Sequence, residues 1–203
     1  MTEYSQAEID AIKRIGNGPI EDYEKRRKFA SEKISMMTAL YVQNKIKNAT
    51  IKIGANPERS ASDLIYEGLL EGWCWQSANT LGVLFNDSDT ISRGKLDLNS
   101  GNYPHSWIEF GHRDQDFVFD PALSILSKKE KYYELLSAEK KQEISAAMAR
   151  KTLISLIGDS KEPICIKPIN DLADPFFRMD SEVEAHIKGN KVKKIKAHFY
   201  YDD

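Results

Sequence analysis

The sequence has little of what marks a secreted, membrane-spanning or nucleic-acid-binding protein. It contains only two cysteines, and residues 1–10 lack both the basic start and the apolar stretch of a secretory signal. No run approaches the roughly 18 apolar residues that a bilayer span requires. The formal net charge of −2 creates no field that attracts a polyanion. We therefore expect a cytoplasmic protein with reduced cysteines that binds neither membrane nor nucleic acid.

Length and composition indicate one folded domain. The chain has 203 residues, of which 41% are hydrophobic and 30% are charged, and these values are close to the averages for soluble globular proteins. A chain of this length can bury one substantial core. We expect a single domain over residues 1–203, with an N-terminal helical part (1–58), a core that carries the candidate site (60–125), and a C-terminal part made of a helix and strands (126–203).

Helical periodicity predicts several helices. The pattern in residues 6–48 predicts a short helix followed by a longer one. Ser60 and Asp63 have the spacing of a capping box that begins another helix, and the apolar spacing in residues 73–85 predicts a third segment. Residues 127–157 carry Lys, Glu, Ala and Leu in helical proportion and predict one long helix.

Strand signals are concentrated in the second half of the chain. Residues 92–104 are rich in Gly, Asn, Asp and Ser and predict a surface loop. Two short strands, 106–110 and 116–120, follow with a turn between them. A second hairpin is predicted for residues 183–188 and 191–200, on either side of a Gly-Asn pair. The pattern of predicted helices and strands along the whole chain indicates an α+β fold.

Cys74 lies at the start of the helix predicted for residues 73–85. Backbone N–H groups without helical partners, and the positive end of the helix dipole, favour a thiolate over a neutral thiol at this position. The same N–H groups can hold the oxyanion that forms when sulfur attacks a carbonyl. Cys74 is therefore a candidate nucleophile.

The first predicted hairpin brings together a histidine and an aspartate. His105 and Trp107 share one face of their strand. With an even-numbered turn, Trp107 lies opposite Val118, and His105 lies directly opposite Asp120. Opposed side chains have β-carbons about 4.5–5.5 Å apart, close enough for a carboxylate to orient an imidazole. A slip of one residue would send the carboxylate to the other face.

Three motifs resemble those of the transglutaminase-like superfamily, which has a papain-like cysteine enzyme fold. Residues 72–75 (Gly-Trp-Cys-Trp) resemble the Gly-x-Cys-Trp around the nucleophile of papain-like and transglutaminase enzymes. Residues 105–109 (His-Ser-Trp-Ile-Glu) resemble the His-x-Trp-x-Glu strand of transglutaminase-like domains. Residues 117–121 (Phe-Val-Phe-Asp-Pro) are similar to the hydrophobic strand of that family that ends in Asp-Pro. The resemblance covers roughly residues 60–125.

The resemblance implies both a fold and a reaction. The fold has N-terminal helices, with the nucleophile at a helix start packed on an antiparallel sheet. In the reaction, Cys74 attacks the carbonyl of a peptide, protein or small amide, His105 handles the proton, and Asp120 fixes the imidazole. A thioester acyl-enzyme results, and the acceptor is water or an amine. Trp73 and Trp107 are candidates for lining the substrate groove.

Several alternatives stay open at the level of sequence. A binding or scaffold module can keep this fold and leave the three residues unused. Residues 72–76 (Gly-Trp-Cys-Trp-Gln) also resemble the nucleophile region of arylamine N-acetyltransferases, although Glu71 stands where that family has a second glycine. Trp73 and Trp107 are also typical of core packing.

No metal or cofactor is expected from the spacing of the candidate ligands. Cys74, His105, His112 and Asp120 include residue types that bind metals, but they lack the paired short spacings of zinc sites. Glu109 shares the face of His105 and is read as a solvated strand residue or an ion-pair partner. The sequence does not set the oligomeric state.

Overall fold

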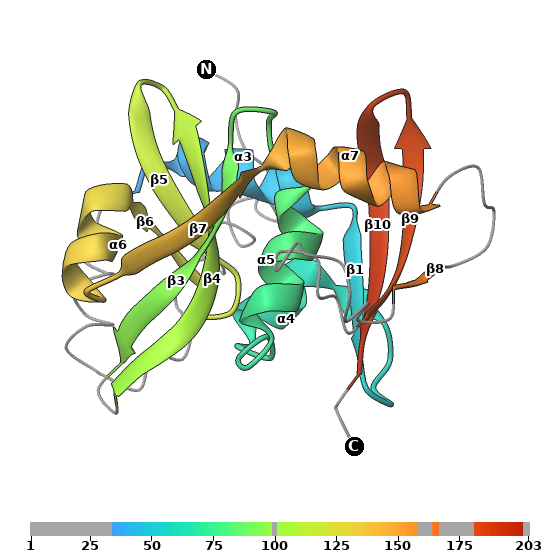
Figure 1. The fold of residues 1–203 in the computed structure, drawn as a ribbon, viewed down its shortest axis with the longest axis horizontal. Coiled ribbons are helices and arrows are strands. Elements are labelled where there is room, and N and C mark those ends of the chain that lie inside the picture. The colour runs from blue at the N-terminus through green and yellow to red at the C-terminus, as the bar shows by residue number, and fades with distance from the viewer. Residues whose placement is uncertain (1–33, 99–100, 158–163, 167–180, 201–203) are drawn as a thin grey trace.

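The computed structural model describes residues 34–98, 101–157, 164–166 and 181–200. The described part of the chain is a mixed α/β fold with two mostly antiparallel sheets (Figure 1). The short helix predicted within residues 6–48, and the first part of the longer one, lie outside the described residues. Of the described helices, none has both the length and the apolar character needed to cross a membrane.

The first sheet has the strand order β2-β1-β10-β9-β8. Its strands are β1 (Ala49–Ile53), β2 (Arg59–Ser60), β8 (Ile164–Ile166), β9 (Ser181–Lys188) and β10 (Lys191–Phe199). The strands β1 and β10 run parallel and the other neighbours are antiparallel. The hairpin predicted for residues 183–200 is confirmed as β9 and β10. The strand β1 was not predicted.

The second sheet has the strand order β6-β5-β4-β3-β7 and is antiparallel throughout. Its strands are β3 (Thr90–Leu98), β4 (Gly101–His112), β5 (Gln115–Asp120), β6 (Ile125–Lys128) and β7 (Glu139–Ser145). The two strands predicted around residues 106–120 are confirmed, and both are longer than predicted. The predicted loop over residues 92–104 is wrong, because most of it forms β3 and the start of β4.

The long helix predicted for residues 127–157 is also wrong. This segment contains the end of β6, then α6 (Lys129–Leu135), β7 and α7 (Ala146–Ile157). Ser137 has a φ of 44°, in the left-handed region where a right-handed helix stops. The glycine at position 94 lets β7 come close to β3, since a β-carbon there would overlap the carbonyl of Glu139. Pairing with β3 overrides the helical propensity of the charged residues in β7.

Three further helices lie near or between the sheets: α3 (Met36–Ile46), α4 (Ala61–Tyr66) and α5 (Cys74–Gly82). The predicted cap is present, since the Ser60 Oγ accepts the backbone N–H of Asp63 at 3.1 Å. In Figure 1 α5 lies between the two sheets, where it contacts β3, β4 and β10. A β-carbon at Gly82 would collide with Ile91 of β3, so the glycine allows this close packing.

Two apolar cores bury the two faces of the second sheet. The larger core lies around α5 and includes Ile108, Phe110, Phe117 and Phe119 of this sheet, as predicted for their face. The smaller core lies under α6 on the opposite face, and its buried members are Leu96, Trp107, Val118, Leu123, Ile125, Tyr132 and Leu136. The sorting of side chains along β4 and β5 therefore follows the predicted alternation.

Candidate active site

Cys74 is the first residue of α5, as the sequence predicts within one position. No side chain caps the start of this helix, and the first turn is closed by the backbone N–H of Ser77, which donates to the carbonyl of Trp73 at 2.9 Å. Gly72 leads into the helix with a φ of 83°, a conformation that favours glycine. The sulfur therefore lies beside backbone N–H groups at the positive end of α5. Cys74 is 9% exposed.

His105 and Asp120 contact each other across the hairpin of β4 and β5. The Nε2 of His105 lies 2.8 Å from the Oδ2 of Asp120, and both residues are buried. Their contact is diagonal rather than directly opposed, because Glu109 is the residue that pairs with Val118. The predicted register, with Trp107 opposite Val118, is therefore wrong by two residues.

The turn of the hairpin explains this difference. The strands continue to His112 and from Gln115, so only Arg113 and Asp114 form the turn, with φ values of 51° and 60°. Two central residues with positive φ are typical of the tight turn that suits twisted strands. A shift of two residues leaves every side chain on its predicted face, since faces repeat with a period of two.

Asp120 is fully buried and has four hydrogen-bond donors around its carboxylate. Its Oδ1 accepts the backbone N–H groups of Ala122 and Leu123 at 3.1 and 3.0 Å. Its Oδ2 accepts the hydroxyl of Tyr132 at 2.7 Å and faces His105. A buried carboxylate with this many donors has all of its hydrogen-bonding capacity used and is fixed in orientation.

The charge state of His105 follows from these contacts. Burial lowers its pKa, but the charge and hydrogen bond of Asp120, together with the hydrogen bond and charge of Cys74, outweigh burial and raise the pKa to about 10. Since Asp120 occupies Nε2, the ring nitrogen left for Cys74 is Nδ1. His105 is therefore protonated at neutral pH and is suited to pair with a thiolate.

The two tryptophans proposed for substrate binding are packed against other rings. Trp73 is half-buried and stacks on Phe199 of β10, with 5.5 Å between ring centroids. Trp107 has no exposed surface and lies 5.7 Å from the ring of Tyr132. Both placements fit the alternative of core packing. Trp107 in particular has no surface with which to line a groove.

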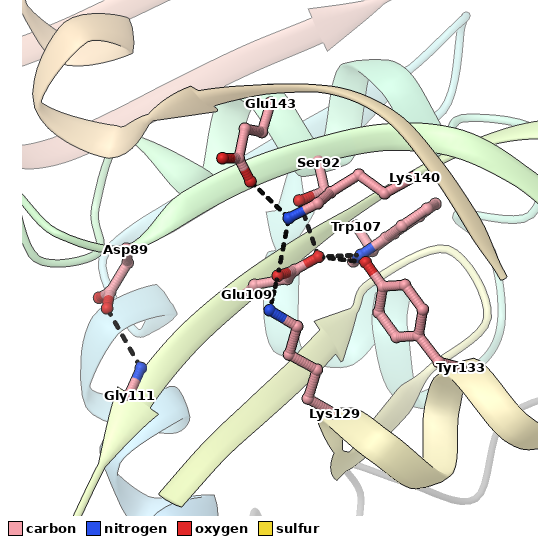
Figure 2. Close-up of polar contacts among 9 residues, drawn as sticks. All are labelled: Asp89, Ser92, Trp107, Glu109, Gly111, Lys129, Tyr133, Lys140 and Glu143. Atoms are coloured by element: carbon pink, nitrogen blue, oxygen red, sulfur yellow. Dashed lines mark hydrogen bonds and ion pairs between the residues drawn. The ribbon is translucent and has the colours of Figure 1, made fainter. Parts of the chain in front are cut away.

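Glu109 is buried beside Trp107 and, of its two predicted roles, has that of an ion-pair partner rather than a solvated strand residue (Figure 2). Figure 2 shows donors converging on its carboxylate from β3, β4, α6 and β7. The five donors are Ser92 Oγ (3.0 Å), Trp107 Nε1 (3.0 Å), Tyr133 Oη (2.5 Å), Lys129 Nζ (2.6 Å) and Lys140 Nζ (3.4 Å). This cluster ties α6 and β7 to the central strand of the sheet.

The electrostatics of Glu109 match that role. Burial raises its pKa, but hydrogen bonds from Lys129, Tyr133 and Trp107 and the charge of Lys129 outweigh burial and lower the pKa to about 2. The carboxylate is therefore ionised throughout the physiological range. It lies two residues from Trp107 on the same face as His105, so it holds α6 and β7 against the strand that carries His105.

Sequence reasoning missed Tyr132 as a neighbour of the candidate site. The residue falls inside the long helix predicted for residues 127–157, where no local signal separates it from Tyr133. Only the break into β6, α6 and β7 directs its hydroxyl to Asp120.

Within the described ranges, no cluster of three His, Cys, Asp or Glu side chains is arranged to hold a metal ion.

Comparison with known proteins gives no assignment: no family model matches the chain, and no curated protein or solved structure is significantly similar to it.

Proposed function

We propose that this chain is a transglutaminase-like cysteine acyl-transfer enzyme or hydrolase that acts on an amide or peptide substrate. Cys74 is the nucleophile, His105 the acid and base, and Asp120 the residue that orients His105. One observation carries the proposal: the Nε2 of a buried imidazole lies 2.8 Å from Asp120 Oδ2, and the same imidazole is close enough to the cysteine at the start of α5 for that cysteine to raise its pKa.

The first half of the reaction forms a thioester. The thiolate of Cys74 attacks the carbonyl carbon, an S–C bond forms, and the carbonyl electrons move to oxygen. Backbone N–H groups at the start of α5, which no side chain caps, can donate to that oxyanion. The protonated His105 gives its proton to the leaving amine as the C–N bond breaks.

The second half of the reaction releases the acyl group. Neutral His105 takes a proton from the acceptor, which attacks the thioester carbon, and the S–C bond breaks to return the thiolate. Water as acceptor gives hydrolysis, and an amine gives transfer. Asp120 keeps the same ring nitrogen protonated in both halves, because its Oδ2 accepts from Nε2.

The arrangement of elements supports a transglutaminase-like assignment. A nucleophile at the start of α5, a histidine on β4 and an aspartate at the end of the neighbouring strand β5 follow the order of the motifs in residues 72–75, 105–109 and 117–121. The helix α5 packs against the antiparallel sheet that carries the other two residues. An active triad of this order has both the nucleophile and the proton carrier that acyl transfer needs.

Acylation with p-nitrophenyl acetate tests the proposal. The wild-type protein should release p-nitrophenolate in a burst equal to the enzyme concentration, and intact mass spectrometry should show one acetyl group per chain. Peptide mapping should place that group on Cys74. Cys74→Ala should lose both signals, by about 100-fold or more, because no thiolate is then available to attack.

The second cysteine provides the matched control. Cys165→Ala removes one thiol, as Cys74→Ala does, and should keep the burst and the label. Thermal unfolding followed by circular dichroism checks that both variants fold. Equal labelling of Cys74→Ala and wild type, or no labelling of wild type at all, would contradict the proposal and favour a non-catalytic module. Adding a primary amine to the acylated protein then identifies the acceptor from the rate of deacylation.

A further inference from the structure

Tyr132 is a fully buried phenol in contact with the triad, and the mechanism above does not use it. Its hydroxyl donates to the Oδ2 of Asp120 at 2.7 Å. The same oxygen accepts the N–H of His105 Nε2, with 2.8 Å between nitrogen and oxygen. Two donors from different parts of the fold, β4 and α6, therefore share one carboxylate oxygen.

The two oxygens of the Asp120 carboxylate have different donors and therefore different roles. The Oδ1 of Asp120 is held by the backbone N–H groups of Ala122 and Leu123, which lie in the same chain segment and fix the carboxylate plane. Tyr132 acts on the oxygen that faces His105. A second donor on this oxygen draws electron density toward itself, so the attraction between the oxygen and the imidazolium becomes weaker.

Tyr132 acts only as a donor in this position. Burial, followed by the charge and hydrogen bond of Asp120, raises its pKa well above the ordinary value of 10.0. The phenol therefore keeps its proton over the whole range in which the triad works.

The rest of α6 fixes the position of the phenol. The ring of Tyr132 packs 5.7 Å from that of Trp107 in the smaller core. The neighbouring residues Lys129 and Tyr133 bond to Glu109, which anchors the helix to β4 (Figure 2). Two adjacent tyrosines thus donate to two different buried carboxylates, Tyr132 to the triad and Tyr133 to Glu109.

We infer that Tyr132 is a positioning residue of the triad, whose hydroxyl shares Oδ2 with His105 and thereby sets how strongly Asp120 holds the imidazolium. The importance of this contact for catalysis rests on the proposed function. The contact itself acts on the protonation of His105 and is open to measurement without any substrate.

The test is the titration of His105 followed by NMR of its ring carbons. The Cys74→Ala background removes the thiolate, so that only Asp120 and its donors act on the imidazole. Adding Tyr132→Phe should shift the titration of His105 upward by about 0.5–1 pH unit, because Oδ2 then has one donor fewer and holds the imidazolium more strongly. His105→Gln assigns the signal.

Tyr133→Phe in the same background is the matched control. It removes the hydroxyl of the next residue of α6, which donates to Glu109 and not to Asp120. It should leave the titration of His105 unchanged. Equal titrations for the Tyr132→Phe and Tyr133→Phe proteins, or a downward shift for Tyr132→Phe, would overturn the inference.

A second measurement covers the case in which Tyr132→Phe does not fold. Replacing the tyrosines with 3-fluorotyrosine makes the phenol a stronger donor and should move the titration of His105 downward. An unchanged or upward titration would overturn the inference.

In proteins with Cys74 intact, Tyr132→Phe should lower kcat for acylation about 10-fold with little change in KM. Lack of acylation in wild type would end the proposed function, whereas the titration would still decide the role of Tyr132.

Discussion

The two faces of the sheet that carries the candidate site are buried by different means. On the face toward α5, the apolar side chains of Ile91, Ile108, Phe110 and Phe119 pack in the larger core. The face toward α6 combines a small apolar core with buried His105, Glu109 and Asp120. Apolar area stabilises the first face, and partnered charges are needed to stabilise the second.

Because its two faces differ in this way, one sheet can serve both stability and chemistry. An apolar face tolerates no polar group without a partner, and it contributes a stability that does not depend on pH. On the charged face each carboxylate is surrounded by donors, four at Asp120 and five at Glu109, and those at Glu109 lower its pKa. The stability of this face should therefore depend on pH.

Mutation of the apolar face should destabilise the protein most. Phe119→Ala removes a fully buried ring that stacks near Phe85, with 6.1 Å between ring centroids. The free energy of unfolding should fall by about 3–5 kcal/mol, through lost burial and the cavity left behind. Urea unfolding at several pH values measures this loss, which should be the same at each. A loss that varies with pH would show that the two faces are not separable.

The charged face should respond to both mutation and acid. Glu109→Gln leaves Lys129 and Lys140 without their shared carboxylate and should cost about 2–3 kcal/mol at pH 7. The pKa of folded Glu109, about 2, lies below its ordinary value of 4.5. Its contribution is therefore present above pH 4.5 and is lost as the pH falls toward 2. Urea unfolding from pH 7 to 2.5 should show a flatter profile for Glu109→Gln than for wild type.

A second acidic partner of Lys140 gives the control for this experiment. Glu143 also pairs with Lys140, but half of its side chain is exposed. Glu143→Gln should change the free energy of unfolding by less than about 0.5 kcal/mol, as is usual for surface ion pairs. If both variants lost the same stability, burial would not be what makes Glu109 important.

The same contrast explains how much of this molecule could be predicted from the sequence. Alternation along β4 and β5 is a local pattern, so the faces of His105, Trp107 and Phe119 were predicted correctly even though the register was wrong by two residues. The start of α5 at Cys74 and the cap at Ser60 are also local signals.

The parts that were not predicted depend on contacts between distant residues. The strand β7 has a helix-forming composition and becomes a strand only because β3 offers it an edge beside Gly94. The separation of α6 from α7 follows from that pairing, and with it the contact of Tyr132 with Asp120. A single sequence shows which residues prefer helices, but not which edge of a sheet is open to them.

The smallest effect should come from a locally encoded contact outside both faces. Ser60→Ala removes the oxygen that accepts the N–H of Asp63 at the start of α4, the helix before the nucleophile. The free energy of unfolding should fall by about 1 kcal/mol, the usual cost of losing such a cap. Because the cap carries no charge, the loss should be equal at pH 7 and pH 3. Ser60→Asp, which restores an acceptor, should recover most of it at pH 7, and failure of this rescue would show that Ser60 stabilises α4 by packing rather than by its hydrogen bond.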